Sequence, residues 1–325
     1  MKHEQRIDAW LPGDPHGVQD AVIPDSRVVG GVATGQGRRS YVLITAAYNE
    51  EEHIEKAILS VAAQTVLPAR WIVVSDGSSD RTDDIVRQHA DMLPFIELLS
   101  RPRSKGHDFA SKVHALNEGA NRLKNATFEF IGHLDADVSF GPTYYADLLE
   151  QFERDPKLGL AGGAICEWEG NRYAPRALNQ VWSVPGSVQF FRRPCYESLE
   201  GFRPVPYGGE DWWAEVTSRM NGWRVRSFPI LPVYHHRVPR DTAGRLRYWY
   251  RQGMMDFSLG THPLFEVLRL ARRIWVRPRI LGALARLSGF ARAAIRAEDR
   301  IVSREFMAFL RKEELGRLRW FGRET

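Results

Sequence analysis

The sequence predicts an α/β fold in which a mostly parallel sheet is flanked by helices. Between residues 41 and 137, short apolar runs alternate with segments that have the periodicity of amphipathic helices. The apolar runs are continuous rather than alternating, which is typical of parallel strands covered on both faces. With 325 residues, 43% of them hydrophobic, the chain can build one large core and an accessory segment.

Each predicted element is read from its local pattern. In the first half we expect strands at 41–48, 70–76, 95–100 and 128–137, and helices within 49–64, 77–90 and 109–124. In the second half we expect helices at 144–156 and 208–222, strands at 159–170, 187–193 and 223–237, and several helices from 263 onward. This pattern predicts a flexible arm (1–39), a main domain (40–240) and a basic helical C-terminal region (241–325).

Composition narrows the setting and the partners. The formal net charge of +5 suits an anionic partner such as a nucleotide or a membrane face. The two cysteines, Cys166 and Cys195, fit a reduced compartment. The first residues have no apolar signal core, and no run reaches the roughly 18 apolar residues of a spanning helix. We therefore expect a cytoplasmic protein, either free or peripheral on the inner face of the plasma membrane.

Polar residues follow three of the predicted strands. In open parallel sheets, ligands bind at the carboxyl ends of the strands. This rule singles out three short groups: Tyr48, Asn49 and Glu50; Asp76, Gly77 and Ser78; Asp135, Ala136 and Asp137. Each group also has a structural interpretation as a turn or a helix cap.

Asp135 and Asp137 are separated by one residue and can face the same pocket. Two carboxylates in a dry site repel each other, and Mg²⁺ or Mn²⁺ is their natural partner. His235 and His236 end a later strand and could add a ligand, but neighbouring strand residues point opposite ways, so at most one would serve. The alternative is a polar strand exit with two ordinary histidines.

Glu210 and Asp211 stand between two glycines and two tryptophans in "YGGEDWW". Bulky aromatic neighbours can desolvate a carboxylate and tune its proton affinity, as a general base requires. The alternative is an acidic helix start, where negative charge is favourable.

Taken together, these segments resemble family 2 glycosyltransferases with the GT-A fold. The resemblance is carried, in order, by "ITAAYNEEEHIEKAILSVAAQT", "WIVVSDGSSDRTDDIV", "SKVHALNEGA", "HLDADVSF" and "GGEDWW". It covers about residues 41–240 and departs from the family pattern where Ala46 or Ala47 replaces the usual proline. The region after Arg240 is similar to the C-terminal part of bacterial polysaccharide-assembly members.

The resemblance implies a Rossmann-like GT-A domain that binds a nucleoside-diphosphate sugar. Tyr48, Glu50 and Asp76 would hold the nucleoside, and Lys112, or alternatively Lys105, would lie near the nucleotide.

The same resemblance implies the chemistry. Asp135 would face the ribose or a metal-bound water, Asp137 would ligate Mn²⁺ or Mg²⁺, and one of the two histidines would be a further ligand. Asp211, or alternatively Glu210, would be the base that activates a hydroxyl of a glycan or lipid-linked acceptor. One displacement would invert the anomeric configuration. Such a reaction would belong to exopolysaccharide or other cell-envelope glycan assembly.

The basic region from residue 263 mixes many arginines with Leu, Ile, Trp and Phe. A basic amphipathic helix suits an anionic membrane surface, whereas the alternative is a set of helices packed on the main domain with a solvated basic face.

Three other functions compete with glycosyl transfer. A catalytically idle nucleotide-binding or membrane-peripheral scaffold would not need all three of Asp135, Asp137 and Asp211. A nucleic-acid-binding protein is suggested by charge alone, without an RNA-binding or helix-turn-helix signature. A dehydrogenase is disfavoured because no G-x-G-x-x-G joins the first strand and helix.

Overall fold

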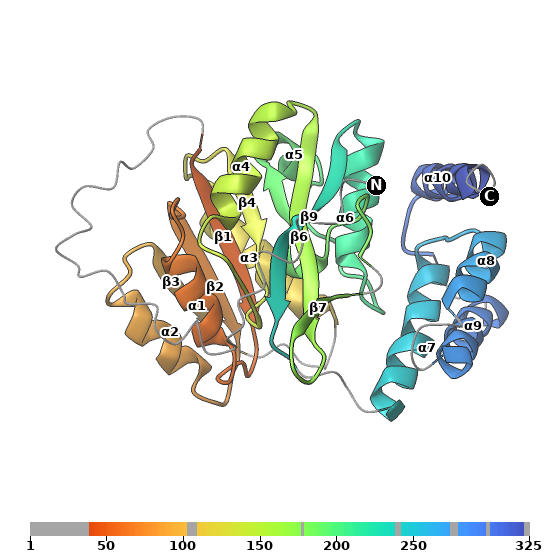
Figure 1. Ribbon diagram of the computed structural model, residues 1–325, viewed down its shortest axis with the longest axis horizontal. Coiled ribbons are helices and arrows are strands. Elements are labelled where there is room, and N and C mark those ends of the chain that lie inside the picture. Colours follow the sequence, from red (N-terminus) through yellow and green to blue (C-terminus); the bar gives the residue numbers. More distant parts are fainter. Residues whose placement is uncertain are drawn as a thin grey trace. The chain divides into compact units, whose positions relative to one another are not determined.

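The computed structural model (Figure 1) describes residues 39–102, 109–176, 179–237, 242–273, 279–296 and 300–321. These residues form two units. The sheet unit comprises residues 39–102, 114–201 and 223–237, and the helical unit comprises 109–113, 202–222 and the described residues from 242 onward. The predicted arm lies outside the described residues except for Arg39. Residues 202–222, which fall within the predicted main domain (40–240), group with the C-terminal helices.

The sheet unit is built on a nine-stranded sheet whose first part is parallel. Four parallel strands lie in the order β3-β2-β1-β4, with bounds β1 Tyr41–Ala47, β2 Arg70–Asp76, β3 Ile96–Arg101 and β4 Phe130–His133. The sheet continues through β8 (Phe190–Arg192), β6 (Leu158–Trp168), β9 (Arg224–His235) and β5 (Val138–Phe140), and β7 (Tyr173–Pro175) pairs with β6. Strands β6 and β9 are parallel, whereas β8 and β5 run antiparallel to their neighbours.

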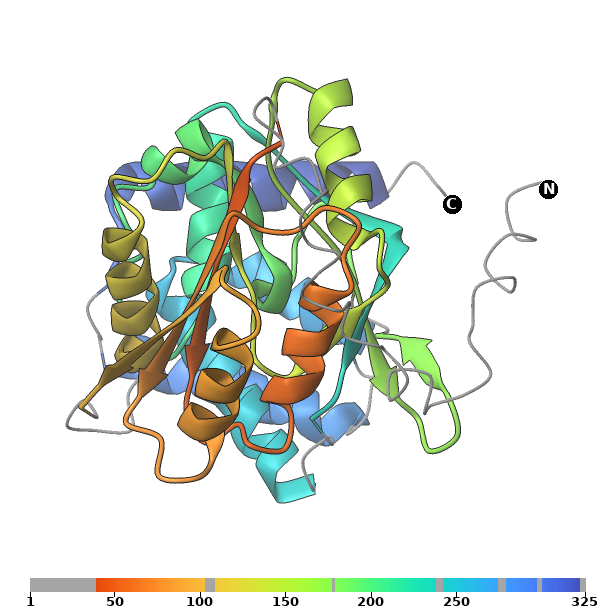
Figure 2. The same ribbon diagram turned by 90° about the vertical axis from the view of Figure 1, so that its left-hand side faces the viewer.

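Helices cover both faces of this sheet, as Figure 2 shows. On one face, α1 (Ile54–Ala62), α2 (Thr82–Ala90) and α4 (Tyr144–Arg154) bury their apolar sides in a cluster that includes Leu43, Trp71 and Phe190. On the other face lies α3 (Phe109–Arg122). A Cβ atom on its Gly119 would lie 2.6 Å from the Ile44 side chain, so glycine permits the close approach. The predicted α/β class is confirmed.

Two of the element boundaries that differ from the prediction lie at the predicted site. Helix α1 begins at Ile54 rather than near residue 49, because Asn49 has a left-handed backbone (φ 53°) and the next residues form a turn. The Ile54 N–H closes this turn on the Glu50 carbonyl at 2.9 Å. Strand β4 ends at His133, so Asp135 and Asp137 lie on the turn that leads into β5.

The helical unit contains α6 (Glu210–Met220), α7 (Thr242–Ser258), α8 (Pro263–Arg273), α9 (Arg279–Ile295) and α10 (Arg304–Phe321). Helices α7 and α9 approach so closely that a Cβ atom on Gly253 would collide with the Arg286 carbonyl, and one on Gly289 with the Tyr250 carbonyl. Helix α10 packs on α6, where Arg219 bonds Glu313 at 2.9 Å. Among the described residues, none of the helices is both long enough and apolar enough to cross a bilayer.

Candidate functional site

The turns that follow β1 and β2 are tied together by side chains. The Asn49 backbone N–H donates to the Ser78 hydroxyl at 3.2 Å, and the Asn49 side-chain oxygen accepts from the Ser79 N–H at 2.8 Å. Gly77 has φ 69°, a conformation that favours glycine. Tyr48, just before this turn, is half-buried. Two of the three predicted groups therefore form one rigid edge at the carboxyl ends of the parallel strands.

Asp76 ends β2 and is buried, with 8% of its surface exposed. Arg101, at the end of the neighbouring strand β3, places its Nε 3.2 Å from the Asp76 carboxylate and lies 3.5 Å from Glu118 of α3. The parallel register of β2 and β3 sets Asp76 directly beside Arg101. A carboxylate held this way presents hydrogen-bond acceptors at the carboxyl ends of the strands.

The centre of the site is a cluster of four side chains. Arg237, directly after β9, donates from Nε to Asp137 Oδ2 at 2.8 Å and from its other end to Glu50 Oε1 at 2.5 Å. His235 Nε2 lies 3.4 Å from the same Asp137 oxygen. Antiparallel pairing of β5 with β9 creates this arrangement, because it sets Val138, next to Asp137, opposite His235.

Burial and charge act in opposite directions on the two carboxylates. Burial raises the pKa of Glu50 to about 7, against the lowering effect of Arg237. Burial alone would also raise the pKa of Asp137, but hydrogen bonds and charge from His235 and Arg237 hold it below its usual range. Asp137 is therefore an anion at any physiological pH, whereas Glu50 can carry a proton.

The two adjacent histidines have different surroundings, as their alternation along a strand requires. Both ring nitrogens of His236 are engaged: Nε2 lies 2.8 Å from the Ser139 hydroxyl and Nδ1 lies 3.0 Å from the Tyr173 hydroxyl. Burial and then the charge of Lys56 lower the pKa of His236 to about 4. The geometry thus favours His235, not His236, as the histidine that can act with Asp137.

The turn between β4 and β5 holds the remaining predicted residues. The Asp135 N–H donates to the Ser187 carbonyl at 2.9 Å, and the Asp137 carbonyl accepts from the His236 N–H at 2.8 Å. Ala136 is buried between them, and the Asp135 side chain is half-buried. The turn is thus anchored on both sides by backbone hydrogen bonds.

The side chains around Asp137 could supply part of the ligand shell of a divalent ion. Within the described residues, no three histidines, cysteines or acids gather as a complete ligand group. Asp137 and His235 supply one oxygen and one nitrogen donor. Glu50 Oε2 and His235 Nδ1 are buried without a hydrogen-bond partner in the described part of the chain. This set fits an ion that takes two protein ligands and completes its shell with ligand phosphates and water.

The second predicted carboxylate pair belongs to the helical unit. Gly209 precedes α6 with φ 98°, which turns the chain sharply into the helix. Glu210 is buried, bends back to the Gly209 N–H at 3.1 Å and lies 3.7 Å from Lys112 Nζ. Asp211 is half-buried and accepts from the Trp212 N–H at 2.8 Å. Of the two acids, Asp211 is the more accessible. The alternative lysine, Lys105, lies outside the described residues.

Sequence reasoning missed Arg237. Its guanidinium joins two carboxylates that lie 100 and 187 positions away in the chain. The available signal was its place directly after the two histidines, at the carboxyl end of a strand.

Comparison with known proteins gives this site its context. The family model for glycosyl transferase family 2 matches residues 42–202. The matched residues, 42–202, form a glycosyl transferase family 2 domain. The matched range contains the sheet-unit residues Glu50, Asp76 and Asp137, so the cluster described above lies within or beside the family domain.

Curated relatives of this glycosyltransferase family support the assignment. The chain is 34% identical over 160 residues to a poly-beta-1,6-N-acetyl-D-glucosamine synthase of Staphylococcus aureus, a match covering 49% of this chain and 33% of the relative. The corresponding synthase of Staphylococcus epidermidis is 30% identical over 154 residues, covering 45% and 31%. The match thus spans about a third of the length of these relatives.

Two solved structures share the fold of this chain. The mannosyltransferase PcManGT from Pyrobaculum calidifontis, in complex with GDP-Man and Mn²⁺, has a TM-score of 0.53 and 22% identity, covering 87% of this chain and 81% of its own. S. aureus TarS in complex with UDP-GlcNAc has a TM-score of 0.52 and 16% identity, covering 83% and 78%. The predicted GT-A fold is confirmed.

Proposed function

We propose that this chain is an inverting glycosyltransferase that moves a sugar from a nucleoside-diphosphate sugar to a hydroxyl acceptor. The observation that carries the proposal is the joining of Asp137, His235 and Glu50 at the carboxyl ends of the strands. The family 2 domain supplies the reaction class, and two neighbours of the same fold are complexes with GDP-Man and UDP-GlcNAc. The acceptor is proposed to be a glycan or a lipid-linked sugar in cell-envelope glycan assembly.

The edge formed by β1 and β2 is the proposed nucleoside site. Asp76, held by Arg101, would accept hydrogen bonds from the base or ribose, and Tyr48 and Glu50 would line the same edge. Asn49, Gly77, Ser78 and Ala136 would act through the backbone that shapes this edge. Lys112, paired with Glu210, would provide positive charge for the nucleotide.

Asp137 and His235 are the residues that would hold Mn²⁺ or Mg²⁺, with Asp135 facing the ribose or a metal-bound water. When bound, the ion would neutralise charge on the leaving diphosphate. Asp137 suits this task because its pKa is held low and it stays an anion. His236 is not proposed as a ligand, since both its ring nitrogens are hydrogen bonded.

Asp211 is the proposed general base. It would take the proton from the acceptor hydroxyl as that oxygen attacks the anomeric carbon from the face opposite the diphosphate. One displacement of this kind inverts the configuration, through a transition state with oxocarbenium character. Glu210 is the weaker candidate because it is buried and already paired with Lys112.

Thermal stabilisation by nucleotides tests the donor site first. UDP, GDP, dTDP, CMP and ADP are each added with Mn²⁺ and with EDTA. A ligand at about 100 times its Kd adds roughly 2.7 kcal/mol to the free energy of unfolding. We expect a metal-dependent shift with one nucleoside diphosphate, lost in Asp137→Asn. No shift with any nucleotide would contradict the proposed donor.

Asp211→Asn tests the base. Removing a general base that is needed for acceptor attack should lower transfer by about 10²-fold or more, while nucleotide stabilisation stays unchanged. The matched control is Asp84→Asn, an exposed acid on α2 with 77% of its side chain accessible. Equal transfer by Asp211→Asn and the parent would show that Asp211 is not the base.

NMR of the product gives the anomeric configuration and tests inversion.

A further inference from the structure

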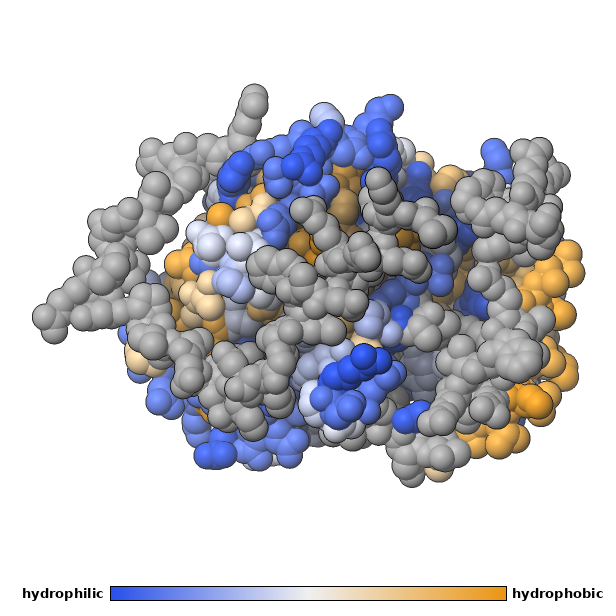
Figure 3. Space-filling view, in the orientation of Figure 1, coloured by the Kyte–Doolittle hydropathy of each residue, from blue (hydrophilic) through white to orange (hydrophobic). Residues whose placement is uncertain are grey.

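Helices α8 and α9 carry their apolar side chains outward. On α9, the exposed large side chains are Ile280 (62%), Leu281 (58%), Leu284 (55%), Leu287 and Ile295. On α8, the exposed ones are Leu264, Val267 and Leu268. These spacings place each set on one face of its helix. Figure 3 shows the corresponding apolar surface at the right of the view, where α8 and α9 lie in Figure 1.

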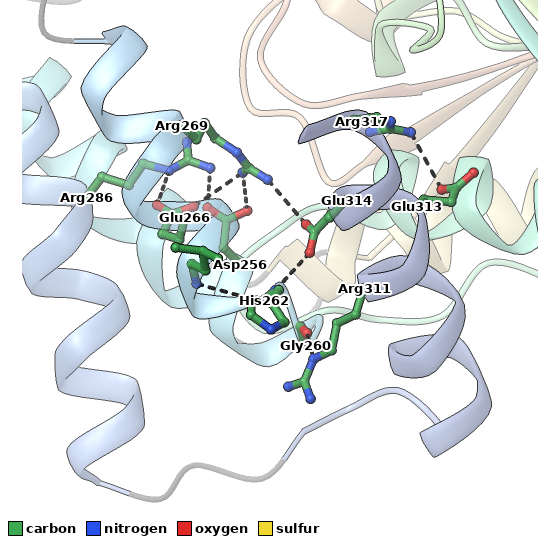
Figure 4. A network of polar contacts seen from close by, with 11 residues as sticks. Asp256, Gly260, His262, Glu266, Arg269, Arg286, Arg311, Glu313, Glu314 and Arg317 are labelled. Atoms are coloured by element: carbon green, nitrogen blue, oxygen red, sulfur yellow. Dashed lines mark hydrogen bonds and ion pairs between the residues drawn. The ribbon is translucent and has the colours of Figure 1, made fainter. Parts of the chain in front are cut away.

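The inward faces of the same helices combine buried charged side chains with apolar residues such as Leu270 and Phe290. Arg286 of α9 is 2% exposed and bonds Glu266 of α8 at 2.7 Å and Asp256 of α7. Arg269 of α8 bonds Asp256 at 3.0 Å and lies 3.5 Å from Glu314 of α10. Figure 4 shows this network between the helices. On α9, the inward side also carries Gly282, Gly289, Phe290 and Ala293.

These helices bury charged side chains and expose large aliphatic ones, which differs from an ordinary water-facing helix that buries its apolar face and exposes its charges. Eight exposed large apolar side chains gather on these two neighbouring helices, and exposed apolar patches of this kind mark interaction sites. Glycine contacts between α7 and α9 fix which side of α9 is inward, so rotation of the helix cannot hide the apolar face. The surface therefore calls for an apolar partner.

The charge around this surface identifies the partner. Residues 263–296 contain eight arginines and one acid, Glu266. Glu266 is buried and paired with Arg286 and Arg269, so it offers no negative charge to a partner. The described arginines Arg292 and Arg296 near the end of α9 are exposed. An apolar face with cations and no accessible acid in its sequence complements an anionic lipid surface.

The side-chain types agree with lipid rather than with a protein partner. The exposed large hydrophobic side chains in the described parts of α8 and α9 are all aliphatic. Protein interfaces instead concentrate Trp, Tyr and Arg at their centres. We propose that the outward face of α8 and α9, which we call the docking face, lies in the interfacial layer of an anionic membrane. Docking there would suit a lipid-linked acceptor, a point that rests on the proposed function.

Flotation of the full chain with vesicles tests the docking face. We expect binding to phosphatidylcholine vesicles that contain phosphatidylglycerol, and weaker binding to phosphatidylcholine alone. The double variant Leu281→Gln, Leu284→Gln should lower partitioning by roughly tenfold or more, because it removes apolar burial in lipid. The matched control is Ile230→Gln on β9, an exposed aliphatic residue (81%) outside the docking face. It should float like the parent chain.

A second pair of variants tests the charge. Arg292→Gln with Arg296→Gln should weaken binding to the anionic vesicles and leave binding to phosphatidylcholine alone unchanged. Equal flotation of the leucine double variant and the parent overturns the proposal. Absence of parent flotation, with a concentration-dependent dimer that the leucine variant abolishes, assigns the docking face to a second copy and also overturns it. Nucleotide-induced stabilisation of the same variants is measured separately, so failure of docking is distinguishable from failure of the proposed transfer.

Discussion

Glu314 is predicted to make the helical unit less stable as the pH rises. It is fully buried on α10, where it accepts from the His262 N–H at 2.8 Å and lies 3.5 Å from Arg269. Together with Glu314, the network contains the carboxylates of Asp256 and Glu266 and the guanidinium groups of Arg269 and Arg286. Full ionisation would leave one uncompensated negative charge. Burial accordingly raises the pKa of Glu314 to about 7, against the lowering effects of its hydrogen bonds and of Arg269.

The sign of the effect follows from linkage. The folded state holds the Glu314 proton more tightly than the unfolded state, in which the carboxyl has its ordinary pKa of 4.5. The free energy of unfolding therefore falls as the pH rises from about 4.5 to 7, and the loss is complete above pH 7. A shift from 4.5 to about 7 corresponds to on the order of 3 kcal/mol at most.

Glu314→Gln removes this ionisation while keeping an acceptor for the His262 N–H. The variant should be more stable than the parent at pH 8, by up to about 3 kcal/mol, and equal to it near pH 5. Arg269 keeps Asp256 at 3.0 Å and Glu266 at 3.5 Å, so it is not left unpaired. Urea unfolding followed by circular dichroism at pH 5, 6, 7 and 8 gives the difference between the two chains.

The control is again Asp84→Asn, whose carboxylate is exposed and should give a small difference at every pH. If Glu314→Gln were destabilised by the same amount at every pH, Glu314 would be an ionised partner of Arg269. That result would refute the protonation argument.

Two further substitutions test helix packing and the central cluster. Gly289→Ala should destabilise the helical unit by about 3 kcal/mol or more in the urea unfolding assay, because its Cβ would collide with the Tyr250 carbonyl. The control is Gly316→Ala on α10, whose Cβ meets no atom within 4 Å and which should be neutral or slightly stabilising. Arg237→Gln should lower the unfolding free energy by about 1–3 kcal/mol, since it leaves Asp137 without its guanidinium partner. Mn²⁺ should then raise the melting temperature more in Arg237→Gln than in the parent, and an equal shift would count against Asp137 as a metal ligand.

Much of the sheet unit could be predicted from local pattern. The runs that became β1 and β2 are buried on both faces, so continuous apolar stretches identify them without knowledge of their partners. The edge strand β3 is mostly half-buried but was also recognised from its apolar residues. The rule that ligands bind at strand ends then selected Glu50, Asp76 and Asp137. What local pattern could not predict was β5, whose three residues follow the strand expected at 128–137 and were assigned to no element.

The central cluster was beyond sequence reasoning for a related reason. Arg237 contacts Asp137 only because β9 pairs antiparallel with β5. Neither the pairing nor its register can be predicted from the sequence of either segment alone. The choice between His235 and His236 depends on the same register. Alternation predicted that at most one of them would serve as a ligand, and the pairing of β5 with β9 places His235 beside Asp137.

The orientation of α9, which creates the docking face, could not be predicted from hydrophobic periodicity. On α9, the leucines share one face and Arg286 lies on the other, a pattern that fits either orientation: leucines inward as a core, or the arginine inward as a partner of buried acids. Hydrophobic periodicity alone favours the first. The deciding residue is Gly289, because only the glycine side of α9 can meet the α7 backbone at the observed separation. That side carries Arg286, so the leucines must face outward. Close packing of the α7 and α9 backbones therefore sets the orientation of α9, and this orientation exposes an apolar face that suits lipid better than water.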